Sequence, residues 1–166
     1  MSASTRPSWL PGLLLFEEYG GSWREYEDAL YDVFRRDFVD TTATFQDWPI
    51  RVRREPWLKG KEWLFWHITD KDVEPGSGDE ERIPDFRRCE RLPWIRPMIE
   101  HSTDPALRVW EEQRAGDQRA HLWLEHQDFL VVLARRRGYW MLWTAFYIDS
   151  NGYRAQLRTR SRRPKS

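Results

Sequence analysis

The last third of the chain contains four strand-length segments that are separated only by short polar turns. The connectors include residues 115–117 and 136–138, each of which holds a glycine, and glycine is typical of tight turns. Because a parallel crossover needs about a dozen residues or more, strands joined by such turns must run antiparallel. The sequence therefore predicts a four-stranded antiparallel meander. Its strands are expected at residues 107–113, 119–125, 129–135 and 139–149.

Upstream of this sheet, local patterns predict a helix and a hairpin. Ser22 followed three residues later by Glu25 is the pattern of a helix N-terminus. Apolar residues then recur at spacings of three and four, which indicates a helix over residues 22–38 with one apolar stripe for a core. Two β-branched or alternating runs within residues 41–54, on either side of residues 47–49, predict a hairpin.

The next helical region is interrupted, and with it the expected fold is complete. Pro93 and Pro97 rule out one continuous helix over residues 84–101, so a broken helical segment is expected there. The predicted fold class is α+β, with the N-terminal helix, the hairpin and the broken segment packed on the four-stranded antiparallel sheet. The 166 residues fit a single domain at residues 9–157. Residues 1–8 are expected to be disordered, and residues 158–166 to form a basic tail.

Charge is distributed unevenly along the chain. The formal net charge is zero, yet residues 150–166 carry six basic side chains and no acidic one. This leaves 21 basic against 27 acidic residues in the rest of the chain. A basic end of this kind either holds phosphates by releasing counterions or is a solvated, disordered terminus.

Cysteine, histidine and the apolar residues exclude several classes of protein. One cysteine, Cys89, cannot form an internal disulfide and fits a reducing, cytoplasmic location. Cys89 and the four histidines fall in no ligand spacing, so neither a metal nor another cofactor is expected. The apolar run at residues 9–16 is broken by Pro-Gly and is too short to span a bilayer, so we expect no membrane association and no export.

Aromatic residues are unusually frequent, at 15% of the chain with 11 tryptophans. Tryptophan packs cores, and it also supplies stacking surfaces and interface anchors. Most of these tryptophans are expected in the core. Alternation along residues 139–149 places Thr144 on one side of the last strand with Leu142, and Trp143 on the other side with Tyr147.

His67 and Thr144 are the first candidates for chemistry. His67 ends an aromatic run, and histidine is the side chain whose proton moves near neutral pH. A lone histidine beside aromatic residues is often a hydrogen-bonded core residue instead. Thr144 is a small polar group among large apolar ones, so it is either a strand residue bonded to a neighbour or a hydroxyl at the mouth of a cleft.

Arg87, Arg88 and Arg91 form a tight basic cluster in the predicted helical segment. Asp85 and Glu90 are close enough in sequence to pair with one or two of these arginines. An arginine left unpaired could hold a phosphate through two hydrogen bonds. The cluster is therefore either structural or a phosphate-binding group.

Three short segments of this sequence carry a resemblance to a known group of proteins. Phe-Trp-His at residues 65–67, Asp-Phe-Arg-Arg-Cys-Glu-Arg at 85–91 and Thr-Ala-Phe-Tyr at 144–147 resemble segments of small phage-associated proteins. Those proteins resemble the barnase, EndoU, colicin and RelE superfamily of metal-independent ribonucleases. The resemblance covers residues 57–157, and it implies helices packed on a four-stranded antiparallel sheet.

The resemblance also implies a function and a set of residues. The expected activity is that of a toxin-type, metal-independent endoribonuclease, which cleaves RNA through a 2′,3′-cyclic phosphate. His67 would act as general base or acid, Arg88 would stabilise charge on the phosphate, and Thr144 would orient it. Such an enzyme would need an antitoxin or immunity protein as partner. The residues expected to bind RNA are Arg87, Arg91, Trp66, Trp143 and Tyr147.

Two other functions fit the same sequence. The first is a tryptophan-rich module that binds nucleic acid or protein without catalysis, in which the same histidine and arginines are structural. The second is a phage accessory protein with an obligate partner, which predicts a large apolar patch on the isolated domain.

Overall fold

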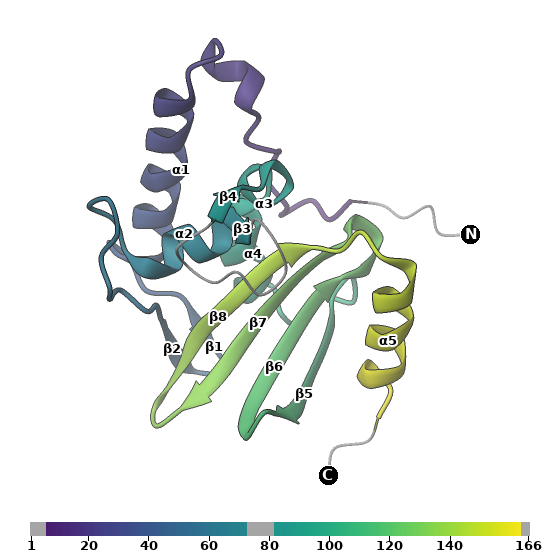
Figure 1. Ribbon diagram of the computed structural model, residues 1–166. Helices are drawn as coiled ribbons and strands as arrows, with labels where there is room; N and C mark the ends of the chain where they lie inside the picture. The colour runs from purple at the N-terminus through teal and green to yellow at the C-terminus, as the bar shows by residue number, and fades with distance from the viewer. Residues whose placement is uncertain (1–5, 73–81, 164–166) are drawn as a thin grey trace.

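The chain has an α+β fold, in which one curled six-stranded sheet carries helices on both faces (Figure 1). The computed structural model describes residues 6–72 and 82–163. The strands of the sheet are β1 (Thr44–Phe45), β2 (Trp48–Arg51), β5 (Arg108–Arg114), β6 (Asp117–Leu124), β7 (Phe129–Arg136) and β8 (Tyr139–Tyr147). Their order across the sheet is β1-β2-β8-β7-β6-β5. A separate two-stranded ladder pairs β3 (Asp70–Asp72) with β4 (Arg82–Pro84).

The predicted meander is present as β5 to β8, but the expectation of a four-stranded, purely antiparallel sheet was wrong. The hairpin that we expected to pack on the sheet joins it, because Ile50 of β2 pairs in parallel with Trp140 of β8. No local pattern signals this pairing, since the two strands are far apart in sequence. Beyond Met141, no strand of the described residues pairs with β8 on this side, and α2 and α3 lie beside its edge instead.

The first helix and the hairpin are confirmed. Helix α1 (Trp23–Phe38) begins after Ser22, whose hydroxyl accepts a hydrogen bond of 3.2 Å from the backbone N–H of Glu25. The turn between β1 and β2 has positive φ at both Gln46 and Asp47, which matches the right-handed twist of a hairpin.

The broken helical segment is also confirmed, and a short helix precedes it. Helix α2 (Trp63–Thr69) leads directly into β3. The broken segment consists of α3 (Phe86–Glu90), the 3-10 turn η2 (Leu92–Trp94) and α4 (Ile95–Glu100). Two further 3-10 turns are η1 (Phe16–Tyr19) and η3 (Glu125–Gln127). In the described part of the chain, no helix is long and apolar enough to cross a membrane.

The two faces of the sheet carry separate apolar clusters. We call one the core face, because its side chains pack with α1 to α4 in the main core; it includes Leu122, Val131, Leu142 and Ala145. We call the other the α5 face, because it packs against a C-terminal helix; it includes Trp110, Trp123, Leu130 and Val132.

The C-terminal helix α5 (Asn151–Ser161) was not predicted, and it occupies the start of the expected basic tail. Ser150 caps it by accepting a hydrogen bond from the N–H of Tyr153, and Leu157 is fully buried against the α5 face. Residues 158–161 are therefore helical. The expected disordered residues 1–5 and the tail residues 164–166 lie outside the described part of the chain.

A β-bulge in β8 changes which face its residues occupy. Val132 pairs with Thr144, whereas Leu133 pairs with Leu142, so Trp143 is an extra residue in the strand. The regular alternation expected for this strand is therefore wrong beyond Leu142. Thr144 lies on the α5 face, while Leu142 and Ala145 both lie on the core face.

Candidate functional site

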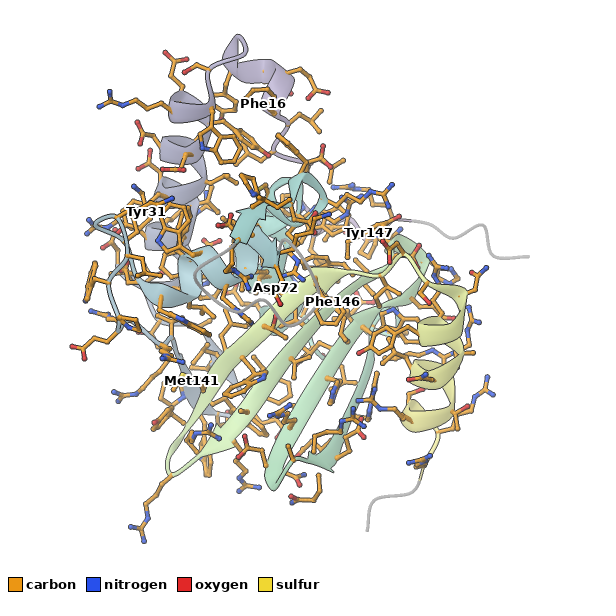
Figure 2. The ribbon with its side chains drawn as sticks, in the orientation of Figure 1. Phe16, Tyr31, Asp72, Met141, Phe146 and Tyr147 are labelled. Atoms are coloured by element: carbon orange, nitrogen blue, oxygen red, sulfur yellow. The ribbon has the colours of Figure 1, made fainter. Side chains whose placement is uncertain are left out.

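The proposed proton carrier, cation and hydroxyl line the same open hollow, which has a volume of about 240 Å³. It lies where α2 and β3 meet the free edge of β8, and Figure 2 shows Asp72 and Phe146 close together at this point. We call it the His67 hollow. Its lining residues are His67, Asp72, Arg82, Arg88, Thr144 and Phe146.

The His67 ring is held by stacking. His67 lies in the last turn of α2, and its ring stacks on that of Trp63 one turn earlier, with centroids 4.7 Å apart and an interplanar angle of 15°. The guanidinium of Arg53 in turn lies 4.1 Å from the Trp63 ring centroid. His67 is half-buried, so a fixed imidazole remains accessible from the hollow.

Two guanidinium groups anchor the same end of α2. Arg88 Nη1 donates hydrogen bonds to the carbonyl oxygens of His67 (3.1 Å) and Asp70 (2.9 Å). Arg82 Nη2 donates to the same two oxygens, at 3.3 Å and 2.7 Å. Carbonyls at a helix C-terminus lack partners within the helix and favour nearby cations. The structure therefore uses both arginines to fix His67 and β3 in place.

These contacts leave part of the Arg88 guanidinium unoccupied, whereas the Arg82 guanidinium is also paired with a carboxylate. Arg88 Nη2 has no hydrogen-bond partner among the described residues, and its Nε lies 3.5 Å from the Asp85 carboxylate. Arg82 Nη1 donates to Asp72 Oδ1 at 2.7 Å. Burial lowers the pKa of Arg88, with the charge of Asp85 opposing this shift. Two adjacent cations at one rim of the hollow are suited to an anionic ligand.

Thr144 and Phe146 form the sheet side of the hollow. Both project from the α5 face of β8, because the bulge at Trp143 turns them away from the main core. The Arg88 guanidinium lies 5.8 Å from the Phe146 ring centroid. No described residue hydrogen-bonds to the half-buried Thr144 hydroxyl, so the hydroxyl is available to a ligand in the hollow.

Trp143 lies next to the hollow on the same face and is 38% exposed. The guanidinium groups of Arg119 and Arg136 lie 4.6 Å and 5.9 Å from its ring centroid. Both arginines also pair with the carboxylate of Asp117, at 3.5 Å and 3.3 Å. The exposed indole is suited to stacking a base.

The other predicted RNA-binding residues lie outside the His67 hollow. Arg87 and Arg91 both stack on Tyr147, at 4.6 Å and 4.5 Å from its ring centroid, and Tyr147 packs on the core side of β8. Trp66 is buried, and its indole N–H donates to the carbonyl of Leu58 at 2.8 Å. In the described structure these four side chains therefore make intramolecular contacts away from the lining of the hollow.

Sequence reasoning missed Arg82 and Asp72. They pair with each other across the β3–β4 ladder, on either side of residues 73–81, which lie outside the described part of the chain. The signal that could have identified them was slight: one acidic and one basic residue flank a glycine- and proline-containing segment.

Two other groups with shifted pKa values, Cys89 and His121, are not among the described residues that line the hollow. Burial raises the pKa of the Cys89 thiol far above its ordinary value, so it stays protonated. His121 lies under α5, and burial lowers its pKa to about 4. Across residues 6–72 and 82–163, no group of three or more His, Cys, Asp or Glu side chains could hold a metal ion.

Comparisons with known proteins add no further information about this site. The chain matches no protein-family model, no curated protein and no solved structure.

Proposed function

We propose that this protein is a metal-independent endoribonuclease whose active site is the His67 hollow. The observation that carries the proposal is the convergence of an imidazole, two guanidinium groups and a hydroxyl from separate parts of the chain in one hollow. Proton transfer requires hydrogen-bond reach, and charge stabilisation requires fixed cations beside the reacting phosphate. The hollow supplies both kinds of group.

The chemistry assigned to the hollow is an attack of the ribose 2′-oxygen on the adjacent phosphorus. The P–O bond to the 5′-oxygen of the next nucleotide breaks, and a 2′,3′-cyclic phosphate forms. His67 transfers a proton at one of these two oxygens, and Asp72 is the second titratable group in reach for the other. Arg88 and Arg82 stabilise the charge on the phosphoryl oxygens, and Thr144 donates a hydrogen bond that orients the phosphate.

The arginine contacts support this assignment of roles. Arg88 is anchored through Nη1 and Nε, which fixes the position of its remaining Nη2. A cation that is already ordered before substrate binds loses little freedom in the transition state. Trp143, beside Thr144, would stack a neighbouring base, so the substrate class is single-stranded RNA.

The test is cleavage of a fluorescently labelled single-stranded RNA in EDTA by the His67→Ala variant. We expect a loss of about 10²–10⁴-fold in rate, together with a cyclic phosphate on the wild-type product. A substrate with a single 2′-deoxynucleotide at the cut position should resist cleavage. His126→Ala is the matched control, because His126 is exposed and far from the hollow in sequence. Undiminished cleavage by His67→Ala would remove this residue from the mechanism.

A binding module without catalysis is the second candidate. The observation that favours it is that Arg82 and Arg88 each hold two backbone carbonyls, which is a structural role that needs no substrate. Purified protein that binds the RNA and leaves it intact would support this function over the nuclease.

A further inference from the structure

A second hollow, of about 460 Å³, lies between α5 and the end of β5. We call it the Arg114 hollow. Three arginines line it together with two uncharged hydrogen-bonding side chains, and no carboxylate is among its lining residues. The residues are Arg114, Ala155, Gln156, Thr159, Arg160 and Arg163.

Arg160 forms the fixed inner wall of this hollow. Its Nε donates to Glu112 Oε1 at 2.8 Å, and its Nη2 lies 3.1 Å from His121 Nε2. The His121 ring stacks on Trp110, with centroids 4.9 Å apart. Arg160 is buried, so its charge is held in place and largely matched by Glu112.

The outer wall carries cations that no described residue neutralises. Arg114 and Arg163 are exposed, and neither forms an ion pair within residues 6–72 and 82–163. Elsewhere on α5 the arginines are paired: Arg154 with Asp128 and Arg158 with Glu125. Two guanidinium groups that have no ion pair among the described residues therefore lie together at the Arg114 hollow, where their planar shape is suited to phosphate oxygens.

The two hollows open on the same face of the sheet. Thr144 of the first hollow lies in a cross-strand row with Val132, His121 and Trp110, and Arg114 lies four residues further along β5 than Trp110. Three strand spacings and four residues of rise separate the hollows by about 20 Å. Trp143 and Arg119 lie on the path between them. In Figure 1, strands β6 to β8 lie between α5 and the α2–β3 region.

We infer that the Arg114 hollow is a second phosphate-binding site, which holds the backbone of the same RNA strand several nucleotides away from the bond at the His67 hollow. This inference rests on the proposed function for the identity of the strand. A single strand that reaches both hollows crosses Trp143, whose ring is sequence-tolerant as a stacking surface. The protein thus binds single-stranded RNA that is long enough to reach both sites more tightly than it binds very short oligonucleotides.

The test measures RNA binding separately from cleavage. Fluorescence anisotropy measures the affinity for a dinucleotide and for a 15-nucleotide single-stranded RNA. Two proteins are compared: the His67→Ala variant, and the same variant that also carries Arg114→Gln/Arg163→Gln. For the longer RNA, the two arginine substitutions should make the plot of log association constant against log salt concentration less steep by about 1.4. Each phosphate contact on a single strand contributes about 0.7 to this slope. At physiological salt this corresponds to a roughly tenfold loss of affinity. Dinucleotide binding should not change.

The matched control is Arg24→Gln/Arg54→Gln, which removes the same charge from two exposed arginines, one in α1 and one shortly after β2. Equal losses in the two pairs would show that net charge alone matters and would overturn the inference, as would an unchanged salt slope. The inference would also be overturned if the protein bound polyglutamate more tightly than RNA and Arg114→Gln/Arg163→Gln abolished that binding. Wild-type protein that binds the long RNA through this hollow without cutting it would refute the nuclease while leaving the second site intact.

Discussion

Asp70 provides a stability test of the structure that does not depend on the proposed function. It is the first residue of β3, directly after α2, and only 9% of it is exposed. Its carboxylate has the Thr69 hydroxyl at 3.4 Å as a weak partner. Burial raises the pKa of Asp70 to about 6, while the positive charge of Arg82 opposes the shift.

The size of the effect on stability follows from the difference between the Asp70 pKa in the native state and in the unfolded state. An ordinary aspartate has a pKa of 3.8, so a native pKa of about 6 corresponds to about 3 kcal/mol. Below pH 3.8 both states are protonated, and the native state has its full stability. As the pH rises from about 4 to about 6, the unfolded chain loses its proton first, and the free energy of unfolding falls by this amount.

Asp70→Asn removes this titration and keeps the shape of the side chain. Urea unfolding gives the difference in unfolding free energy between the variant and the wild type at each pH. This difference should favour the variant by about 3 kcal/mol more at pH 7.5 than at pH 3.5. Asp28→Asn, which makes the same replacement on the exposed side of α1, is the control for the loss of a carboxylate. If Asp70→Asn shifts stability equally at both pH values, the carboxylate is not buried as described and the reasoning is refuted.

Two further predictions concern the α5 face. The effect of His121 on stability has the opposite sign, because burial lowers its pKa from 6.5 to about 4. The free energy of unfolding should therefore fall by about 3 kcal/mol as the pH drops through this range. Urea unfolding of His121→Phe at pH 7 and pH 4 should show that this loss is absent. Trp143→Ala should weaken binding of the 15-nucleotide RNA by about 1–3 kcal/mol in anisotropy titrations. Trp57 is even more exposed than Trp143, so Trp57→Ala is the control and should leave the affinity unchanged. Equal losses in the two variants would contradict a role for Trp143 in stacking.

The parts of the fold that local patterns determine could be predicted from the sequence. The capping pattern at Ser22 and the apolar stripe after it depend only on neighbouring residues, and α1 has the expected bounds. The meander follows from the shortness of its turns. The parallel pairing of Ile50 with Trp140 depends on contacts between distant segments, so no local pattern could predict it.

Helix α5 was missed for a different reason. Its sequence is strongly basic and has low apolar content, which is typical of a solvated tail. The helix is stable because Arg154, Arg158 and Arg160 each meet a carboxylate from the sheet region, and only Leu157 is a fully buried apolar residue. The apolar and capping signals were present at Ser150 and Leu157, but the acidic partners are far away in sequence.

The arginine cluster shows what helical geometry alone could have added. Residues four apart lie on the same side of a helix, whereas adjacent residues point in directions about 100° apart. Arg87 and Arg91 accordingly share Tyr147, and Arg88 points to the His67 hollow instead. The sequence therefore contained enough information to separate Arg88 from the other two, although not to identify which side faced the site.

Thr144 reaches the site only because β8 contains one residue more than its partner strand. In a regular strand Thr144 would share a face with Leu142, and its hydroxyl would lie in the main apolar core. The bulge at Trp143 places Thr144 on the α5 face and leaves the Trp143 ring exposed beside it. Bulges are common next to functional sites because they redirect single side chains. The same irregularity thus made the sequence-based assignment of faces fail and created both the hydroxyl and the stacking surface of the proposed site.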